Sequence, residues 1–304
     1  MFTKRRTFLP TYPKRAPRDH LEHFESLAQR YQGFILDLWG VIHDGVKPYP
    51  GAADCLARIR ALGKPAILLS NAPRRAHAAQ AALRAMGIAD DLYTGILTSG
   101  EATHLALRDR AVPGTDRWFA LLGRRMYHLG PDRDRNVFET LDLDLVEHPA
   151  QADFVLNTGP DDLAGPTEVE DWQSLLQSFR AHNLPMVCAN PDLEVIRGGT
   201  RVICAGALAQ HYETLGGDVR WIGKPDPAIY TPVLAMLGTA PGETLAVGDS
   251  LRTDIAGAKS RDIPSCWVLG GIHEAELGAN PARINAAATA AGLAPAAVLP
   301  RFVW

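Results

Sequence analysis

The segment GFILDLWGVIHDG, residues 33–45, places a carboxylate directly after a short apolar run. Such a run, bounded by turn-forming residues, predicts a buried strand that ends just before Asp37. A carboxylate is costly to bury unpaired, so Asp37 implies a metal ion, a cation or backbone N–H groups beside it. Gly40 permits a close approach of the backbone to a ligand. The alternative that these residues leave open is a strand-end turn in which Asp37 is only a cap.

Apolar runs alternate with helical patterns on both sides of this segment, and this alternation predicts βαβ units and a parallel sheet. The expected strands lie at 33–39, 65–70, 93–98, 219–223, 244–248 and 265–269. The expected helices lie near 51–62 and 75–86, from 227, and from about 252. The sequence therefore predicts a doubly wound, Rossmann-like α/β core.

The stretch from 100 to 204 has a different pattern, with strand candidates at Trp118–Leu122, Phe154–Asn157 and Pro185–Ala189 and a helix near 168–182. It predicts an inserted α/β cap domain. The core then consists of residues 1–99 and 205–304.

Three further segments place polar side chains where strands are expected to end. Ser70 and Asn71 precede a helix, where they can hold an anion or simply cap the helix. Lys224 can neutralise a phosphate or fix a carboxylate, or it is a surface lysine. Asp249 and Asp254, five residues apart, can converge on a hard cation that prefers oxygen ligands, and together they favour magnesium.

The composition narrows the range of partners. A formal charge of −3 over 304 residues provides no general attraction for nucleic acid or anionic membranes, so a small ligand is expected. The Ala-rich stretch 285–298 is too short and too interrupted to span a bilayer. The four cysteines have neither metal-site nor disulfide spacing, which suits a cytoplasmic location. The basic residues within 1–18 predict a solvated arm, because no apolar stretch of an export signal follows them.

Taken in order, these segments resemble the haloacid dehalogenase-like hydrolase superfamily, specifically its NagD-type subclass IIA with a large α/β cap. The resemblance covers about residues 33–275. The motifs that carry it are Gly223-Lys224-Pro225, Val247-Gly248-Asp249-Ser250, Thr253-Asp254-Ile255-Ala256-Gly257-Ala258 and Ala189-Asn190-Pro191-Asp192.

The resemblance implies an Mg²⁺-dependent phosphatase or phosphotransferase that acts on a small phosphorylated metabolite, and a possible homodimer formed through the cap. Asp37 would attack phosphorus and become an aspartyl-phosphate. Asp37, Asp249 and the backbone carbonyl of Trp39 would bind the metal, with Asp254 in support. The phosphoryl group would be held by Ser70, Asn71 and Lys224.

One position departs from the family pattern. Members that hydrolyse phosphate esters carry a second Asp where this chain has Trp39, and an indole N–H cannot serve as an acid or base near neutral pH. The enzyme would then act on a substrate with a stable leaving group, or His43, Asp44 or a residue of the cap would replace that acid. Asn157 and Asp161 are candidate substrate contacts from the cap, or belong only to a polar turn.

The departure leaves two other classes of function open. One is a catalytically impaired protein that binds a phosphate ligand or regulates another process. The other is a dehalogenase-like hydrolase, against which Asp249 and Asp254 argue, because such an enzyme needs no magnesium.

Overall fold

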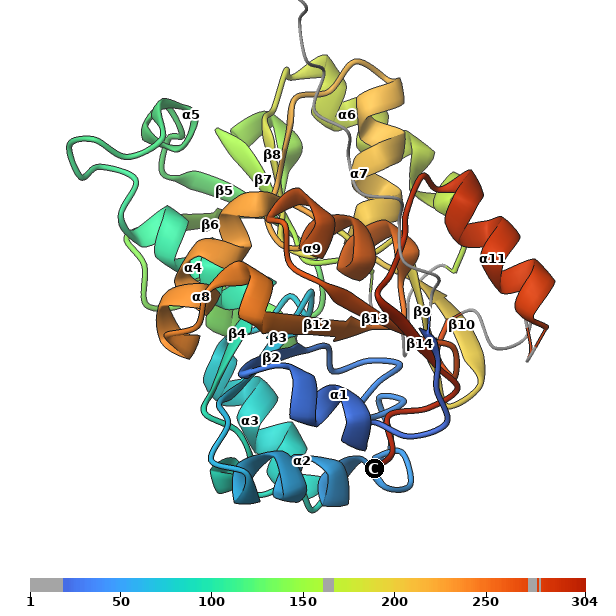
Figure 1. Ribbon diagram of the computed structural model, residues 1–304. Coiled ribbons are helices and arrows are strands. Elements are labelled where there is room, and N and C mark those ends of the chain that lie inside the picture. Colours follow the sequence, from blue (N-terminus) through green and yellow to red (C-terminus); the bar gives the residue numbers. More distant parts are fainter. Residues whose placement is uncertain (1–18, 161–166, 273–277, 279) are drawn as a thin grey trace, which may run out of the picture.

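The computed structural model describes residues 19–160, 167–272, 278 and 280–304. It contains two parallel sheets with flanking helices (Figure 1), which confirms the predicted doubly wound α/β core with an inserted α/β unit. The basic arm predicted within 1–18 lies outside the described residues.

The first sheet has seven strands, and every neighbouring pair in it is parallel. In spatial order the strands are β1 (Asp19–His20), β14 (Ala297–Leu299), β13 (Ser265–Val268), β12 (Thr244–Gly248), β2 (Gly33–Leu36), β3 (Ala66–Ser70) and β4 (Gly95–Thr98). From β2 the chain proceeds outward to β4, and from β12 it proceeds outward in the opposite direction to β14. The boundary between β2 and β12 is therefore the switch point of the sheet.

Helices cover both faces of this sheet (Figure 1). One face packs against α1 (Glu25–Arg30), α2 (Ala52–Ala61) and α3 (Ala76–Ala85), and the other against α8 (Tyr230–Leu237) and α9 (Ala256–Ser260). Leu36 belongs to the first of these cores and Ile35 to the second. Because both faces are buried, the strand is a continuous apolar run without alternation. A third core joins α11 (Pro281–Ala290) to β13 and β14.

The second sheet has five parallel strands. In spatial order these are β11 (Val219–Trp221), β8 (Met186–Cys188), β7 (Phe154–Asn157), β5 (Arg125–Leu129) and β6 (Asp144–Val146). The helices α6 (Gln173–Ala181) and α7 (Ala205–Thr214) pack on one of its faces. On the other face, a separate core includes Leu107 of α4 (Ser99–Arg108) and Phe119. An antiparallel hairpin, β9 (Glu194–Arg197) and β10 (Thr200–Ile203), follows β8.

Two sequence predictions are corrected by this arrangement. Residues 118–122 were expected to form a strand, but α5 (Arg117–Ala120) begins there, since the Asp116 side chain caps it by accepting the Trp118 N–H at 2.9 Å. Residues 219–223 were expected in the first sheet, but β11 pairs with β8 in the second, with Val219 opposite Met186. An apolar strand pattern does not specify which sheet the strand joins. We therefore propose that the inserted unit extends beyond 204, to about residue 221.

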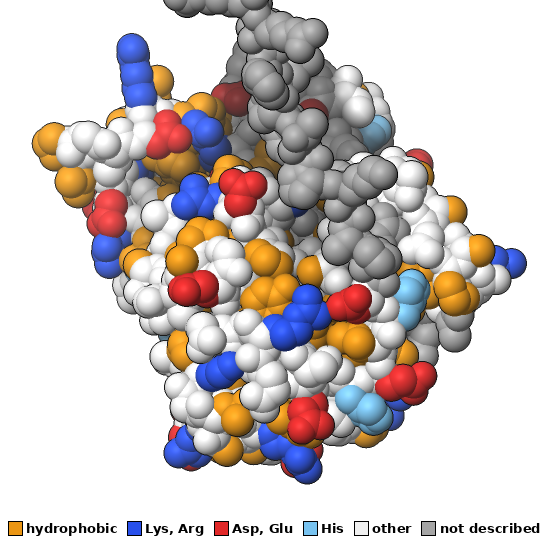
Figure 2. Space-filling view, viewed as in Figure 1, with side chains coloured by type: hydrophobic (Ala, Val, Ile, Leu, Met, Phe, Trp, Pro, Cys, Tyr) orange, Lys and Arg blue, Asp and Glu red, His pale blue; other side chains and the backbone are white. Residues whose placement is uncertain are grey.

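The surface presents no block of a single charge on the face shown in Figure 2, where acidic and basic side chains are interspersed. Within the part of the chain that the structure describes, no helix combines the length and apolar composition needed to cross a bilayer.

Candidate active site

The ends of β2 and β12 bring two predicted carboxylates together at the switch point. Leu36 lies opposite Val247, and Asp37 donates its backbone N–H to the Val247 carbonyl oxygen at 2.9 Å. Asp249 lies one residue beyond the end of β12. This edge, beyond the carboxyl ends of the strands, is where doubly wound sheets bind ligands.

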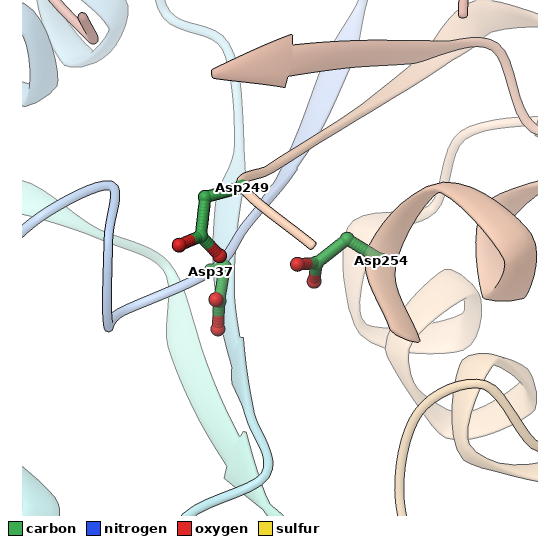
Figure 3. Close-up of side chains that lie close together, drawn as sticks. All are labelled: Asp37, Asp249 and Asp254. Atoms are coloured by element: carbon green, nitrogen blue, oxygen red, sulfur yellow. The ribbon is translucent and has the colours of Figure 1, made fainter. Parts of the chain in front are cut away.

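A third carboxylate joins them from the turn that follows β12. Residues Leu251–Ile255 form one π-helical turn, which Ser250 caps by accepting the Thr253 N–H. Asp254 lies in this turn, and its Oδ2 accepts the Ser250 backbone N–H at 3.1 Å. Ligand oxygens of Asp37, Asp249 and Asp254 lie within 4.8 Å of one another, and all three residues are buried. Figure 3 shows the three side chains pointing toward a common space.

The proximity of these acids is electrostatically unfavourable. Burial, followed by the charge of Asp254, raises the pKa of Asp37 well above its usual range, against the opposing effect of Lys224. Burial and the same neighbouring charge raise the pKa of Asp249 to about 7. A buried carboxylate is stabilised by opposite charge and by hydrogen bonds to its ionised form. The cluster therefore needs more positive charge than the protein itself supplies.

Lys224 supplies one part of that charge. Its Nζ lies 2.6 Å from Asp37 Oδ1 and 2.7 Å from Asp254 Oδ1, and it also donates to the carbonyl oxygen of Leu69 at 3.0 Å. Burial alone would lower the pKa of this ammonium, but the carboxylates of Asp254 and Asp37 raise it overall. Lys224 is therefore a buried cation that bridges two of the three acids, and the surface-lysine alternative is wrong.

Glycine makes the close approach of Asp249 possible. Gly40 has φ +78°, and a Cβ added to it would lie 2.0 Å from Asp249 Oδ2. A side chain at this position would therefore clash with the carboxylate and would strain the backbone. Gly40 does allow a close approach, but to the carboxylate of Asp249, and an approach to a ligand stays a prediction.

The donor set fits a hard divalent cation. The three buried carboxyl groups lie beside the ammonium of Lys224, which offsets at most one negative charge, and the ligand atoms that they offer are all oxygens. Magnesium and calcium prefer such ligands. Asp37, Asp249 and Asp254 would hold the ion, and coordination by the backbone carbonyl of Trp39 stays a prediction.

Ser70 and Asn71 lie at the end of β3, where they were predicted, but their environments differ. The Ser70 hydroxyl accepts the Ala72 N–H at 3.2 Å, so its own O–H remains available to a phosphoryl oxygen. The Asn71 amide donates both to Asp192 Oδ1 at 2.9 Å and to the Lys224 carbonyl oxygen at 3.1 Å, and its Oδ1 accepts the Lys224 N–H at 2.8 Å. Both amide donors are thus engaged within the protein, which corrects the phosphate contact expected of this side chain. Asn71 instead positions Lys224.

His43 and Asp44 have structural contacts in the flap after β2. His43 is buried, its Nδ1 accepts the Gly45 N–H at 2.9 Å, and burial lowers its pKa to about 4. Asp44 Oδ1 accepts the N–H groups of Val46 and Lys47, and these bonds lower its pKa although burial opposes them. A histidine that is neutral and a carboxylate that is ionised near pH 7 are both poor acids.

A cavity of about 1100 Å³ opens onto the acid cluster from between the two sheets. Asp37, Trp39 and Asp249 line it from the first sheet, and Asp192, the hairpin β9–β10 and α7 line it from the second. Farther from the carboxylates its wall is mixed, with apolar Leu193, Val195 and Ile203 beside polar Glu194, Arg201 and His211. His43 and Asp44 are not among its lining residues.

The substrate contact expected of Asn157 is not seen in this cavity. Asn157 is fully buried, its amide donates to the Ala205 carbonyl oxygen at 3.0 Å, and its Oδ1 accepts the Gly159 N–H at 3.1 Å. It stabilises the loop after β7, and its placement corrects the expected role. Asp161 lies outside the described residues.

The sequence predicted no role for Asp192, which ends one of the motifs that carried the resemblance, or for Arg252, which lies between two of them. Asp192 follows β8 and lines the cavity, where it accepts the bond from Asn71. The Arg252 guanidinium donates to the Pro191 carbonyl oxygen. The segment 190–192 is therefore held against the first sheet by two side chains of that sheet's own loops.

Comparison with known proteins agrees with this geometry. A family model described as haloacid dehalogenase-like hydrolase matches residues 34–144, and a HAD-hydrolase-like model matches 221–299. The crystal structure of a haloacid dehalogenase-like hydrolase from Brucella suis is 33% identical, covers 93% of this chain and all of that chain, and superimposes with a TM-score of 0.77. The chain belongs to the haloacid dehalogenase-like hydrolases.

Other relatives specify the branch of this family. Ribonucleotide monophosphatase NagD from Escherichia coli is 28% identical over 247 residues, which cover 78% of this chain and 87% of the relative. A glycerol phosphate phosphatase from Mycobacterium tuberculosis, solved in complex with magnesium, is 26% identical with a TM-score of 0.60, covering 84% of this chain and 74% of that one. This haloacid dehalogenase-like hydrolase is therefore of the NagD type, as the motifs predicted.

Proposed function

We propose that this haloacid dehalogenase-like hydrolase is a magnesium-dependent phosphatase that transfers the phosphoryl group of a small metabolite to Asp37. The observation that carries the proposal is the buried cluster in which Lys224 contacts both Asp37 and Asp254 at the edge of the cavity. A site that only bound phosphate would gain nothing from three carboxylates, because they repel the ligand. A carboxylate nucleophile requires this arrangement.

The side chains have distinct tasks in this scheme. Asp37 attacks phosphorus, and a covalent intermediate divides one difficult displacement into two easier ones. Lys224 offsets the negative charge of both Asp37 and the incoming phosphoryl group. The Ser70 hydroxyl donates to a phosphoryl oxygen. When bound by the carboxylates, Mg²⁺ supplies the remaining positive charge that brings two anions into contact.

The relatives support the reaction class. The named NagD protein and the glycerol phosphate phosphatase both act on phosphate monoesters according to their names. The dehalogenase alternative does not account for the acidic pair Asp249 and Asp254, since a halide-displacing enzyme has no need for a cation there.

Magnesium is expected to control both activity and stability. With p-nitrophenyl phosphate and a panel of sugar and nucleoside monophosphates, turnover should require Mg²⁺ and disappear in EDTA. Because Mg²⁺ binds only the folded chain, it should also stabilise it, by about 2.7 kcal/mol at 100 times its Kd. Calorimetric melting curves with and without Mg²⁺ measure this shift.

The matched variant is Asp249→Asn, which removes one ligand and keeps the shape of the side chain. It should lose most of the Mg²⁺-induced shift as well as the turnover. Phosphatase activity that is unaffected by EDTA, or a melting temperature that does not change when Mg²⁺ is added, would contradict the magnesium requirement.

A further inference from the structure

The replacement for the missing acid is not provided by the loop that carries Asp37. Trp39 lines the cavity but holds no titratable proton, while His43 and Asp44 are engaged with the backbone of their own flap. A phosphate ester with an alkoxide leaving group needs a proton on the leaving oxygen, and such assistance typically contributes about 10² to 10⁴ in rate. The proton donor must therefore come from another part of the cavity wall.

Asp192 enters the cavity from the second sheet, whose side of the wall also carries Glu168, Glu170 and Glu194. One of its oxygens, Oδ1, accepts the Asn71 amide at 2.9 Å, and among the described residues Oδ2 has no hydrogen bond. Asn71 in turn binds the backbone of Lys224, whose Nζ contacts Asp37. Two residues therefore connect the Asp192 carboxyl group to the nucleophile, and its free oxygen is available to a ligand.

The backbone around Asp192 is held firmly. Its N–H donates to Asn190 Oδ1 at 3.0 Å, and its carbonyl oxygen accepts the Gly206 N–H at 3.1 Å from the start of α7. Arg252 holds the preceding carbonyl group of Pro191. Contacts from the loops of both sheets thus hold the Asp192 segment at the edge of the cavity.

The charges around Asp192 suit a group that both gives and takes a proton. Burial raises the pKa of its carboxyl group, and the charge of Asp254 adds to this effect. Lys224, the hydrogen bond from Asn71 and the charge of Arg252 act in the opposite direction. A raised pKa brings a carboxyl group closer to the working pH, where proton transfer is most effective.

We propose that Asp192 is the general acid and base of this hydrolase, in place of the acid that Trp39 lacks. The role rests on the proposed function. In the first step, Asp37 bonds to phosphorus, the bond from phosphorus to the leaving oxygen breaks, and that oxygen takes the proton of Asp192 and departs as an alcohol. In the second step, water attacks phosphorus and gives its proton to Asp192, the bond from phosphorus to Asp37 breaks, and inorganic phosphate departs. Asp37 is again a carboxylate and Asp192 is again protonated.

Asp192→Asn tests this role, because the amide oxygen can still accept the bond from Asn71 while the proton is lost. For an alkyl phosphate, turnover should fall by about 10² to 10⁴. Phosphorylation of Asp37 by acetyl phosphate should fall less than tenfold, since an acyl phosphate needs no protonation to leave. The phosphorylated form should then accumulate, because water is no longer activated, and intact-protein mass spectrometry would detect it.

A second substitution separates proton transfer from positioning. Adding Trp39→Asp to Asp192→Asn restores an acid where the family normally carries one, and it should recover at least tenfold of the lost alkyl phosphate turnover. Asp192→Glu, which keeps the carboxyl group, should retain the wild-type ratio of alkyl to acyl phosphate rates even if it folds less stably. Asp44→Asn, in the flap outside the cavity, should leave that ratio unchanged.

The outcomes are distinguishable. If Asp192→Asn reduced the rates with alkyl and acyl phosphates equally, and Trp39→Asp did not restore them, Asp192 would only anchor the second sheet. An unchanged rate with alkyl phosphates would also overturn the proposal. If neither the wild type nor Asp192→Asn ever carries phosphate on Asp37, the proposed function fails, and the role of Asp192 fails with it. If the wild type is phosphorylated on Asp37 and Asp192→Asn turns over alkyl phosphates at the wild-type rate, the role of Asp192 alone is overturned.

Discussion

Replacing Asp37 by Asn is expected to abolish phosphatase turnover, with a loss on the order of 10⁴-fold or more. The amide nitrogen and oxygen of Asn cannot attack phosphorus, so no aspartyl-phosphate forms, while the shape of the side chain is kept. The measurement is the initial rate with p-nitrophenyl phosphate in Mg²⁺, together with the mass of the protein after exposure to acetyl phosphate. The wild type should gain a phosphoryl group, and Asp37→Asn should not.

The same substitution has an opposite expected effect on stability. Burial and the charge of Asp254 raise the pKa of Asp37, which means that the ionised form is disfavoured in the folded state. A neutral side chain removes that cost, so Asp37→Asn should unfold at a higher temperature than the wild type in metal-free buffer. An inactive variant that is also less stable would show that lost folding contributes to its inactivity. A variant that retains turnover would refute Asp37 as the nucleophile.

Lys224→Met is expected to cause the largest loss of stability, about 3–5 kcal/mol in metal-free buffer. Lys224 is 3% exposed and its ammonium lies between two buried carboxylates, which methionine would leave without a positive partner. Urea unfolding at neutral pH in EDTA measures the loss. Saturating Mg²⁺ should restore part of the lost free energy of unfolding, because a cation bound by the carboxylates offsets the negative charge that Lys224 offsets in the wild type.

Lys259→Met is the matched control. Lys259 is exposed, and among the described residues its Nζ donates only to the carbonyl oxygen of Gly292, so its removal should change the free energy of unfolding by about 0.5 kcal/mol or less. If the free energy of unfolding fell by the same small amount in both lysine variants, the charge of Lys224 would not be needed to hold the acid cluster together.

The core of the fold could be predicted because its strands are buried on both faces. β2, β3 and β12 are continuous apolar runs that end in turn-forming or polar residues, and their bounds agree with the prediction to within three residues. Parallel strands place their carboxyl ends along one edge, so Asp37, Ser70 and Asp249 could be expected together before any contact was known. Short or half-exposed elements such as β6 and β10 carry no comparable signal.

The second sheet was predicted less well, for a physical reason. The run at 118–122 has the composition of a strand, but Asp116 caps a helix there. The strand pattern at 219–221 was detected, but its partner β8 lies more than 30 residues earlier in the chain. The local order of apolar and polar residues indicates how much of a segment is buried. It does not indicate which distant segment packs against it.

The sequence by itself predicted that Asp37 and two further acids lie near one edge of a sheet, because residue type and position at a strand end are local properties. The family and the role of Asp37 as nucleophile candidate came from the resemblance of its motifs. Only the tertiary structure showed the contacts of Asn71, Asn157 and Asp192. The bond from Asn71 to Asp192 joins residues 121 positions apart, and its bond to Lys224 spans 153. Such contacts arise from the packing of one sheet against the other, so no local pattern in the chain encodes them.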